Sequence, residues 1–244
     1  MTDAPELLPL GPDGLLVRFA DQLSEPANRA ALAFRAGLED IGNPGIAETA
    51  SSLASVLVKF RPDVLARKAL EDELGSMLAE RDWLEAPLPA GRRLWRVPVA
   101  LGGAHGPDLE AAADAAGIAP EAAVEDISAA RLRILALGFS PGQPYLGFLP
   151  EHWDIPRQVD VTQEVPRGAV VVAVRQVIPF ANAAPTGWRQ VGRTAFRCND
   201  PGHDPSIPLR PGDEMEFLPV EGRTLDRLLE DASPHGGAER FEIP

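Results

Sequence analysis

Apolar residues in the first hundred positions recur with two periods, one typical of helices and one typical of strands. A helix is predicted between Ser24, a typical N-cap residue, and Gly42, because apolar residues recur there every three or four positions. These residues are Ala30, Ala31, Phe34, Leu38 and Ile41. A second amphipathic helix is predicted to follow a cap at Asp63. Its apolar face consists of Ala66, Leu70, Leu74, Met77 and Leu78.

Short apolar runs predict strands at residues 15–20, 46–52, 55–60 and 93–100. The resulting order is strand, helix, strand, strand, helix, strand, which matches the ferredoxin-like split βαβ plan. We therefore predict an α+β fold class with an N-terminal ferredoxin-like βαββαβ domain, assigned to residues 1–90. Pro98 lacks an N–H group, and this favours an edge position for the last strand.

The pattern changes after residue 91, where short strand-like runs begin to alternate with segments rich in proline and glycine. Two short helices are predicted at residues 108–116 and 120–127, and strands at 133–139, 169–174, 190–198 and 214–220. Such strands and turns favour a β-barrel or a sandwich. We assign a β-barrel domain to residues 91–222. Residues 223–244 are predicted to form a C-terminal helix at 225–231 and a polar tail, which we expect to be disordered.

The charge and composition of the chain argue against several classes of protein. The 244 residues carry a net charge of −13, which disfavours nucleic-acid binding because phosphates need clustered cations. Residues 131–220 hold nine arginines and nine acidic residues, so the negative excess lies elsewhere. The sequence shows neither a signal-peptide pattern nor an apolar run long enough to span a membrane, and a cytoplasmic location is expected. The single cysteine, Cys198, excludes an internal disulfide.

The segment Gly138-Phe139-Ser140-Pro141-Gly142 matches the G-x-S-x-G pattern of the α/β-hydrolase nucleophile elbow. That elbow uses the N–H group of the residue after serine to stabilise the oxyanion, and Pro141 has none. It must also open a helix, whereas glycine and proline residues continue the segment here. We therefore reject this interpretation and assign no catalytic residue.

The sequence offers weak signals for a metal site and none for a phosphate-binding P-loop. Asp200, His203 and Asp204 lie close enough along the chain to bind a metal, although a solvated loop is the favoured interpretation, and we predict no metal site. The sequence contains neither a Walker A motif nor a G-x-G-x-x-G motif after a strand. Any nucleotide would therefore be held in another way.

Two loops rich in glycine and proline are the candidate binding segments. Residues 138–150 combine fixed backbone angles with Tyr145, and their N–H groups could bind an anion; packing into a barrel corner is the alternative. Residues 185–194 place Trp188 in a turn, followed by Arg189 and Arg193. Trp188 could be a core residue or the wall of a ligand site.

Several motifs together resemble one protein family. The segment 138–147 resembles G-F-x-P-G-F-x-Y-L-x-G, and residues 165–170 resemble V-P-A-G-S-V. Gln176 falls on the glutamine of Q-T-G-I-Y-P, residues 185–194 resemble P-G-G-W followed by I-G-R-T, and residues 211–219 resemble P-G-D-x-x-x-F-x-P. By these motifs the chain is similar to the 5-oxoprolinase (B subunit) / allophanate hydrolase subunit 1 family, which includes KipI-like kinase inhibitors and resembles the carboxyltransferase domain of urea carboxylase.

This resemblance implies a C-terminal cyclophilin-like β-barrel and a partner, the subunit 2 homologue (the C subunit of 5-oxoprolinase), with a possible third protein, the LamB/YcsF-type A subunit. It implies a hydrolase subunit that uses ATP with Mg to open 5-oxoproline to glutamate, or an allophanate hydrolase/urea carboxylase-like activity. Biotin would enter only for carboxyl transfer. A regulatory protein that inhibits a histidine kinase is the alternative. The candidate substrate- and nucleotide-binding residues are Ser140, Gly142, Gln143, Tyr145, Gln176, Trp188 and Arg193.

The chain departs from the family pattern where binding groups are expected. Gly of Q-T-G-I-Y-P is replaced by Ile178, and Tyr by Phe180. A β-branched residue does not readily adopt positive φ angles, so an altered backbone is expected at residues 176–181. These changes are consistent with a different amide substrate or with an inactive relative.

Overall fold

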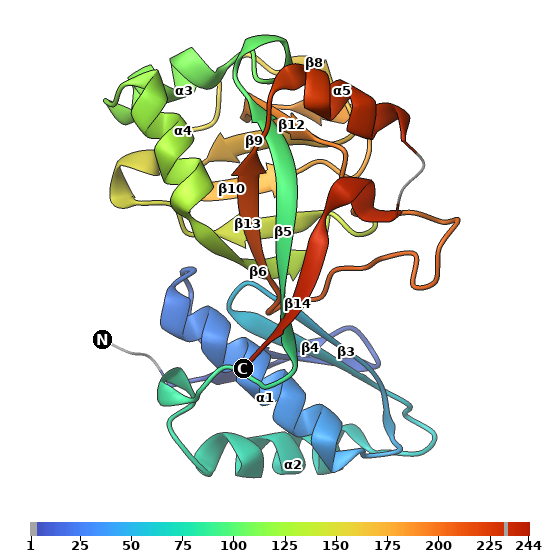
Figure 1. The fold of residues 1–244 in the computed structure, drawn as a ribbon. Helices are drawn as coiled ribbons and strands as arrows, with labels where there is room; N and C mark the ends of the chain where they lie inside the picture. Colours follow the sequence, from blue (N-terminus) through green and yellow to red (C-terminus); the bar gives the residue numbers. More distant parts are fainter. Residues whose placement is uncertain (1–3, 232–233) are drawn as a thin grey trace. The chain divides into compact units, whose positions relative to one another are not determined.

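The computed structural model describes residues 4–231 and 234–244. The chain divides into two compact units, Met1–Ala90 and Gly91–Pro244. Figure 1 shows the elements of each unit along the chain. No helix within the described ranges is both long and apolar enough to cross a membrane.

The first unit contains a four-stranded antiparallel sheet in the order β1-β2-β4-β3. Its strands are β1 (Glu6–Leu10), β2 (Gly14–Arg18), β3 (Ile46–Ser52) and β4 (Ser55–Phe60). The outer position beside β2 is taken by β1, a short proline-containing strand that the sequence pattern did not predict. The expected last strand, residues 93–100, belongs to the second unit. The ferredoxin-like assignment is therefore not confirmed.

The helices of the first unit follow their predicted apolar faces. Helix α1 (Glu25–Ile41) begins after Ser24, whose hydroxyl accepts a hydrogen bond from the N–H group of Ala27, and ends at Gly42 with φ +65°. Helix α2 (Arg67–Ala79) begins later than predicted, because the N–H groups of residues 64 and 65 bond to the carbonyl of Arg61 in a preceding turn. Asp63 is therefore not its cap.

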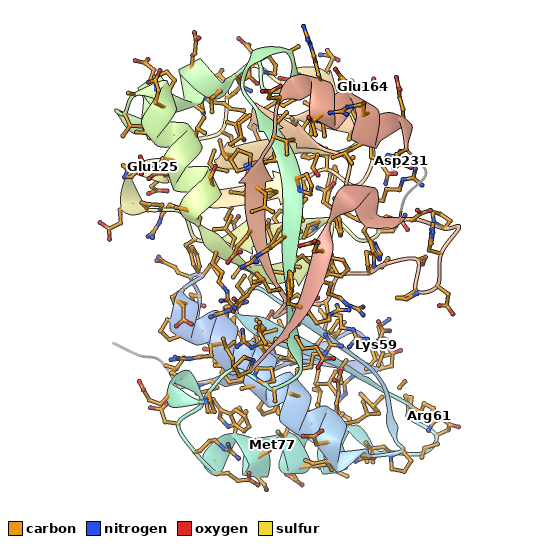
Figure 2. All side chains as sticks on the ribbon, viewed as in Figure 1. Lys59, Arg61, Met77, Glu125, Glu164 and Asp231 are labelled. Atoms are coloured by element: carbon orange, nitrogen blue, oxygen red, sulfur yellow. The ribbon has the colours of Figure 1, made fainter. Side chains whose placement is uncertain are left out.

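One apolar core joins these elements. Phe34 of α1 packs edge-on against Trp83, which lies in a short 3-10 helix, η1 (Trp83–Glu85), with ring centroids 5.0 Å apart. Met77, labelled on α2 in Figure 2, belongs to the same buried cluster. The exposed Lys59 and Arg61, also labelled there, lie at the end of β4 and just after it. The first unit thus has its own closed core.

The second unit is built on a closed barrel. Within the described residues, seven strands follow the order β6-β13-β5-β12-β9-β10-β7, and pairing of β6 with β7 closes the circle. They are β5 (Arg92–Leu101), β6 (Arg131–Leu137), β7 (Pro144–Gly147), β9 (Ala169–Ala173), β10 (Gln176–Pro179), β12 (Arg189–Thr194) and β13 (Glu214–Pro219). A separate two-stranded sheet is formed by β8 (Thr162–Val165) and β11 (Ala184–Thr186). The barrel prediction is confirmed.

Helices surround this barrel. They are α3 (Leu109–Ala116), α4 (Pro120–Ala129) and α5 (Gly222–Glu230), with the short 3-10 helices η2 (Gly103–His105), η3 (Glu151–Trp153) and η4 (Pro234–Gly237). Figure 1 shows α3 and α4 together on one side of the barrel and α5 on another. The barrel interior is filled by a large apolar cluster that includes Trp95, Trp153 and Phe217.

Strand β5 is not an edge strand, contrary to the expectation from Pro98. It pairs with β13 along residues 94–99, with β14 (Glu239–Ile243) along residues 92–96 and with β12 along residues 99–101. Pro98 falls in the interval between β14 and β12, so its missing N–H group breaks neither ladder. The polar tail, expected to be disordered, therefore ends as a sheet strand.

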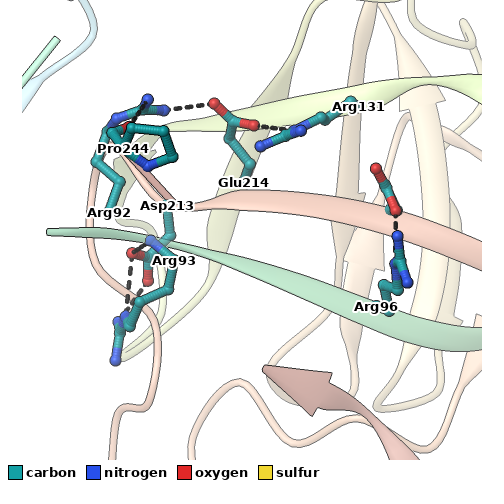
Figure 3. Close-up of polar contacts among 8 residues, drawn as sticks. Arg92, Arg93, Arg96, Arg131, Asp213, Glu214 and Pro244 are labelled. Atoms are coloured by element: carbon teal, nitrogen blue, oxygen red, sulfur yellow. Dashed lines mark hydrogen bonds and ion pairs between the residues drawn. The ribbon is translucent and has the colours of Figure 1, made fainter. Parts of the chain in front are cut away.

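Ion pairs connect the ends of several strands in this unit (Figure 3). Asp213 forms a buried ion pair with Arg93 and also accepts a hydrogen bond from the N–H group of Arg210 at 3.0 Å. Glu214 bridges Arg92 and Arg131, so one carboxylate connects β5 to β6. The network places the start of β5 firmly in the sheet.

Candidate functional site

The wall of the barrel formed by β12, β9 and β10 has an inner and an outer face. Along β9, Val170 and Val172 belong to the interior core, whereas Ala169, Val171 and Ala173 belong to a separate apolar cluster. Because successive side chains of a strand alternate, the second set points outward. The outer face is therefore a second packed surface.

Strand β10 contributes Gln176 and Ile178 to this outer face. Gln176 pairs with Ala173 and Ile178 pairs with Val171, and directly paired residues of antiparallel strands share a face. The segment expected to have an altered backbone thus begins as a regular strand, and Ile178 has no positive φ angle. An isoleucine is accommodated here because the backbone is extended.

Aromatic residues predicted for the site meet on the same face. Trp188 and Phe180 are members of the outer cluster, and Tyr145 packs against it. Val165 of β8 is buried in the same cluster, so the small β8–β11 sheet contributes to its cover. Three of the candidate residues, Tyr145, Gln176 and Trp188, are therefore brought together.

The amide of Gln176 is the unusual group on this face. The side chain is only 7% exposed. Among the described residues it has no hydrogen-bond partner, and its amide atoms are not among the fully sealed ones. Water or a ligand can therefore reach these atoms and form hydrogen bonds with them. Gln176 is thus positioned to bind something that reaches this face.

Trp188 is held by its neighbours. Its backbone N–H group donates to the hydroxyl of Thr186 at 3.1 Å, and its backbone carbonyl accepts from the side-chain amide of Gln158 at 3.1 Å. The guanidinium carbon of Arg157 lies 5.5 Å from the centre of its ring. The sequence analysis did not single out Arg157, because what distinguishes it is contact with a ring from a distant segment.

The candidate residues of the loop at residues 138–143 contact other segments of the second unit. Gly142 has φ +77°, and a Cβ atom there would lie 2.2 Å from the carbonyl oxygen of Cys198. The buried side chain of Gln143 accepts from the N–H group of Ala181 at 3.4 Å. The Ser140 hydroxyl accepts from the side chain of Asn182 at 2.7 Å. These three candidates therefore have partners within the unit.

Among the residues that the structure describes, neither Ser140 nor Cys198 has the surroundings of an activated nucleophile. Ser140 bonds to an asparagine rather than to a histidine, so it lacks the base of a hydrolase triad. Burial raises the pKa of the Cys198 thiol to about 12, and this thiol is therefore not a nucleophile at neutral pH. The rejection of the hydrolase elbow agrees with this geometry.

Arg193 lies on the outer face but at its other end. It pairs with Ala169, four residues along β9 from the Ala173 that faces Gln176. Four residues span roughly 13 Å along a strand. Gln176 and Arg193 therefore lie at opposite ends of this face, and a group the size of one amide would not contact both.

The histidine-containing loop is an internal ion-pair loop. Asp200 lies 3.1 Å from Arg197 and 2.9 Å from His203, all within a few residues of one another. Within residues 4–231 and 234–244, no three histidine, cysteine, aspartate or glutamate side chains gather as a metal site would require. The structure offers no support for the metal alternative.

Comparison with known proteins places these features in a wider group. The family described as "Carboxyltransferase domain, subdomain C and D" matches residues 5–209. The B subunit of 5-oxoprolinase from Escherichia coli O157:H7 is 36% identical over 178 residues, which cover 72% of this chain and 79% of that protein.

Solved structures show the same fold. TTHA0988 is 31% identical with a TM-score of 0.71, and the match covers 86% of this chain. This chain spans only 40% of the length of TTHA0988. The Kluyveromyces lactis urea carboxylase has a TM-score of 0.73 at 19% identity, over 98% of this chain and 24% of that one, which is a likeness of fold alone.

Proposed function

This chain belongs to the 5-oxoprolinase (B subunit) / allophanate hydrolase subunit 1 family, through its carboxyltransferase domain, subdomain C and D, and we propose that it is one subunit of an ATP-dependent amidohydrolase of the 5-oxoprolinase type. The proposal rests on one observation: on an apolar outer face of the barrel, the amide of the largely buried Gln176 has no hydrogen-bond partner among the described residues.

An amide side chain is suited to recognise another amide. The Oε1 atom of Gln176 can accept from a ligand N–H group, while its Nε2 atom donates to the ligand carbonyl. A lactam such as 5-oxoproline presents these two groups side by side. Trp188 and Ile178 belong to the apolar cluster on the same face, and apolar surroundings strengthen the hydrogen bonds made there.

The proposed reaction needs an activated carbonyl, because a lactam is resonance-stabilised and neither Ser140 nor Cys198 has the surroundings of an activated nucleophile. ATP supplies this activation by transferring its terminal phosphoryl group to the amide oxygen, with release of ADP. One water molecule then adds to the activated carbon and the ring nitrogen leaves as the amine, which gives an acyl phosphate; a second water molecule releases glutamate and inorganic phosphate. The role of this chain is then to hold and orient the amide and to keep bulk water from it.

We propose that a subunit 2 homologue, the counterpart of the C subunit of 5-oxoprolinase, completes the site together with a protein of the A-subunit type. TTHA0988 contains more than twice the length of this chain in one polypeptide, so a relative combines this module with a further one. The name of the bacterial relative also describes it as a subunit. Catalysis by the isolated chain is not expected.

The test is substitution of Gln176 in the assembled complex. Gln176→Leu retains the size of the side chain and removes its polar atoms. We expect kcat/KM for ATP-dependent glutamate formation from 5-oxoproline to fall by roughly tenfold to a hundredfold, as for the loss of two hydrogen bonds. The exposed Gln22 lies in the other compact unit, and Gln22→Leu is the matched control.

Unchanged turnover in Gln176→Leu would remove the glutamine from the site. Should the complex hydrolyse no cyclic amide but carry a carboxyl group from carboxybiotin to an amide or urea, the carboxyltransferase alternative would replace this one.

A further inference from the structure

Two arginines of the second unit lie together at the end of the outer face away from Gln176. Arg193 belongs to β12, and Arg167 belongs to the turn that leads into β9. The Nε atom of Arg193 donates to the carbonyl of Arg167 at 3.3 Å. This bond leaves the two terminal nitrogens of Arg193 available as donors.

Within the described residues, the positive charges of this pair are offset only in part, by Asp226. Neither Arg167 nor Arg193 makes an ion pair within the part of the chain that the structure describes. Burial lowers the pKa of Arg193, and the charge of Arg167 lowers it further, while Asp226 opposes both effects. The Asp226 carboxylate lies 3.2 Å from His105 instead. Like charges held together without an ion-pair partner favour binding of an anion.

The surrounding sequence is unusually cationic for this protein. Residues 157–197 contain six arginines and only two acidic residues, in a chain whose net charge is −13. The segment that carries both arginines is therefore cationic in a chain that is acidic overall. This local excess of positive charge does not follow from the overall composition.

The turn that carries Arg167 is fixed against β12. The carbonyl of Gly168 accepts from the N–H group of Thr194 at 2.8 Å, and the N–H group of Gly168 donates to the carbonyl of Phe180 at 2.8 Å. Gly168 has φ +80°, and a Cβ atom there would lie 2.1 Å from the carbonyl oxygen of Thr194. Both arginines are thus attached to rigid backbone, which limits the entropy lost on binding.

We propose that Arg167 and Arg193 form a binding subsite for a phosphate-type oxyanion, separate from the amide-binding position at Gln176. Guanidinium groups match phosphate oxygens through paired N–H donors, so two of them favour a phosphate over a single carboxylate. That the phosphate belongs to a nucleotide rests on the proposed function; oxyanion binding itself does not.

Binding of inorganic phosphate and of ADP to the purified full chain tests this subsite. Isothermal titration at low salt is expected to show binding that weakens roughly tenfold or more in Arg193→Gln and in Arg167→Gln. Arg193→Lys keeps the charge and should recover part of the affinity, which guards against a mere folding defect. Exposed Arg210 has no side-chain partner among the described residues, and Arg210→Gln is the matched control.

The outcomes separate the two proposals. Gln176→Leu should bind both probes as the unaltered chain does, even if it abolishes hydrolysis. ADP binding far tighter than phosphate binding would identify a nucleotide as the source, and equal affinities would identify free phosphate. The subsite is refuted if neither probe binds at millimolar concentration or if acetate binds as tightly as phosphate. It is also refuted if both Arg167→Gln and Arg193→Gln retain full affinity.

Discussion

At the scale of single residues, the clearest determinant of stability is Asp213. It accepts hydrogen bonds from the backbone N–H group of Arg93 at 3.1 Å, from the Arg93 side chain and from the N–H group of Arg210. The indole of Trp95 adds a longer contact of 3.4 Å. A buried carboxylate with this many donors satisfies the buried arginine in return.

Replacement of Asp213 by alanine should therefore be costly. It leaves the buried Arg93 charge without its counter-ion, and we expect the free energy of unfolding to fall by about 3–5 kcal/mol. Urea denaturation followed by circular dichroism measures this change. The exposed Asp160 makes no ion pair in the described chain, and Asp160→Ala is expected to change stability by less than about 0.5 kcal/mol. Equal midpoints for the two variants would contradict the assignment.

The candidate site could be predicted from sequence only in part. Tyr145, Gln176 and Trp188 came from motif resemblance, and strand register brings them onto one face. Arg157 and Arg167 were missed. Arg157 is distinguished by its position over the ring of Trp188, and Arg167 by its charge acting on Arg193. Both features depend on contacts between distant segments, which local sequence does not encode.

At the scale of elements, the short helix that precedes the last strand contains a histidine that packs near two aromatic rings. The ring of His235, in η4, lies 5.0 Å from that of Trp95 and 6.0 Å from that of Phe196, centre to centre. Burial lowers the pKa of His235, and the positive charges of His203 and Arg240 lower it further, against Asp200. Its neutral form is thus favoured in the folded chain.

This shift predicts loss of stability in mild acid. A histidine whose pKa is lower in the folded state contributes stability that is fully present above its unfolded pKa, and that contribution is lost as the pH falls towards the folded pKa. We expect the free energy of unfolding to decrease between pH 7.5 and 5.5. The decrease should be smaller in His235→Asn, because asparagine does not titrate in this range. Asparagine also tolerates the positive φ angle at this position. Parallel pH profiles for both proteins would contradict this role.

Elements with a strong local signal were predicted, and those defined by their partners were not. Helix α1 follows from its cap and its apolar face. Strands β7, β8, β10, β11 and β14 are five residues or shorter, and all except β14 lie among turn-forming residues. Their strand character comes from pairing with strands distant in sequence, either in the barrel sheet or, for β8 and β11, with each other. Pairing with β13 also decided that β5 belongs to the second unit.

At the scale of the whole molecule, the chain holds two separate principal cores. One cluster lies entirely within Met1–Ala90, and the other, which contains Cys198, lies within Gly91–Pro244. A thiol whose pKa burial raises to about 12 reacts only when its core opens. Cys198 is consequently a natural reporter of the second unit alone.

We expect a fragment of residues 91–244 to fold by itself and to protect this thiol. At pH 8 its reaction with a disulfide reagent should be slower by at least roughly a hundredfold than in 8 M urea, because only the opened fraction reacts. The full chain with Leu70→Ala, which damages the first core, serves as a comparison and should protect Cys198 equally. Rapid labelling of the fragment in buffer would show that the second unit needs the first.

The four tryptophans happen to be divided among the compartments of the protein. Trp83 reports on the first core, Trp95 and Trp153 on the barrel interior, and Trp188 alone on the outer face. In a variant with the other three tryptophans replaced by phenylalanine, tryptophan fluorescence would therefore come only from Trp188, on the face that carries Gln176. Its fluorescence would register the arrival of a substrate in real time, before any chemistry occurs and without a coupled enzyme.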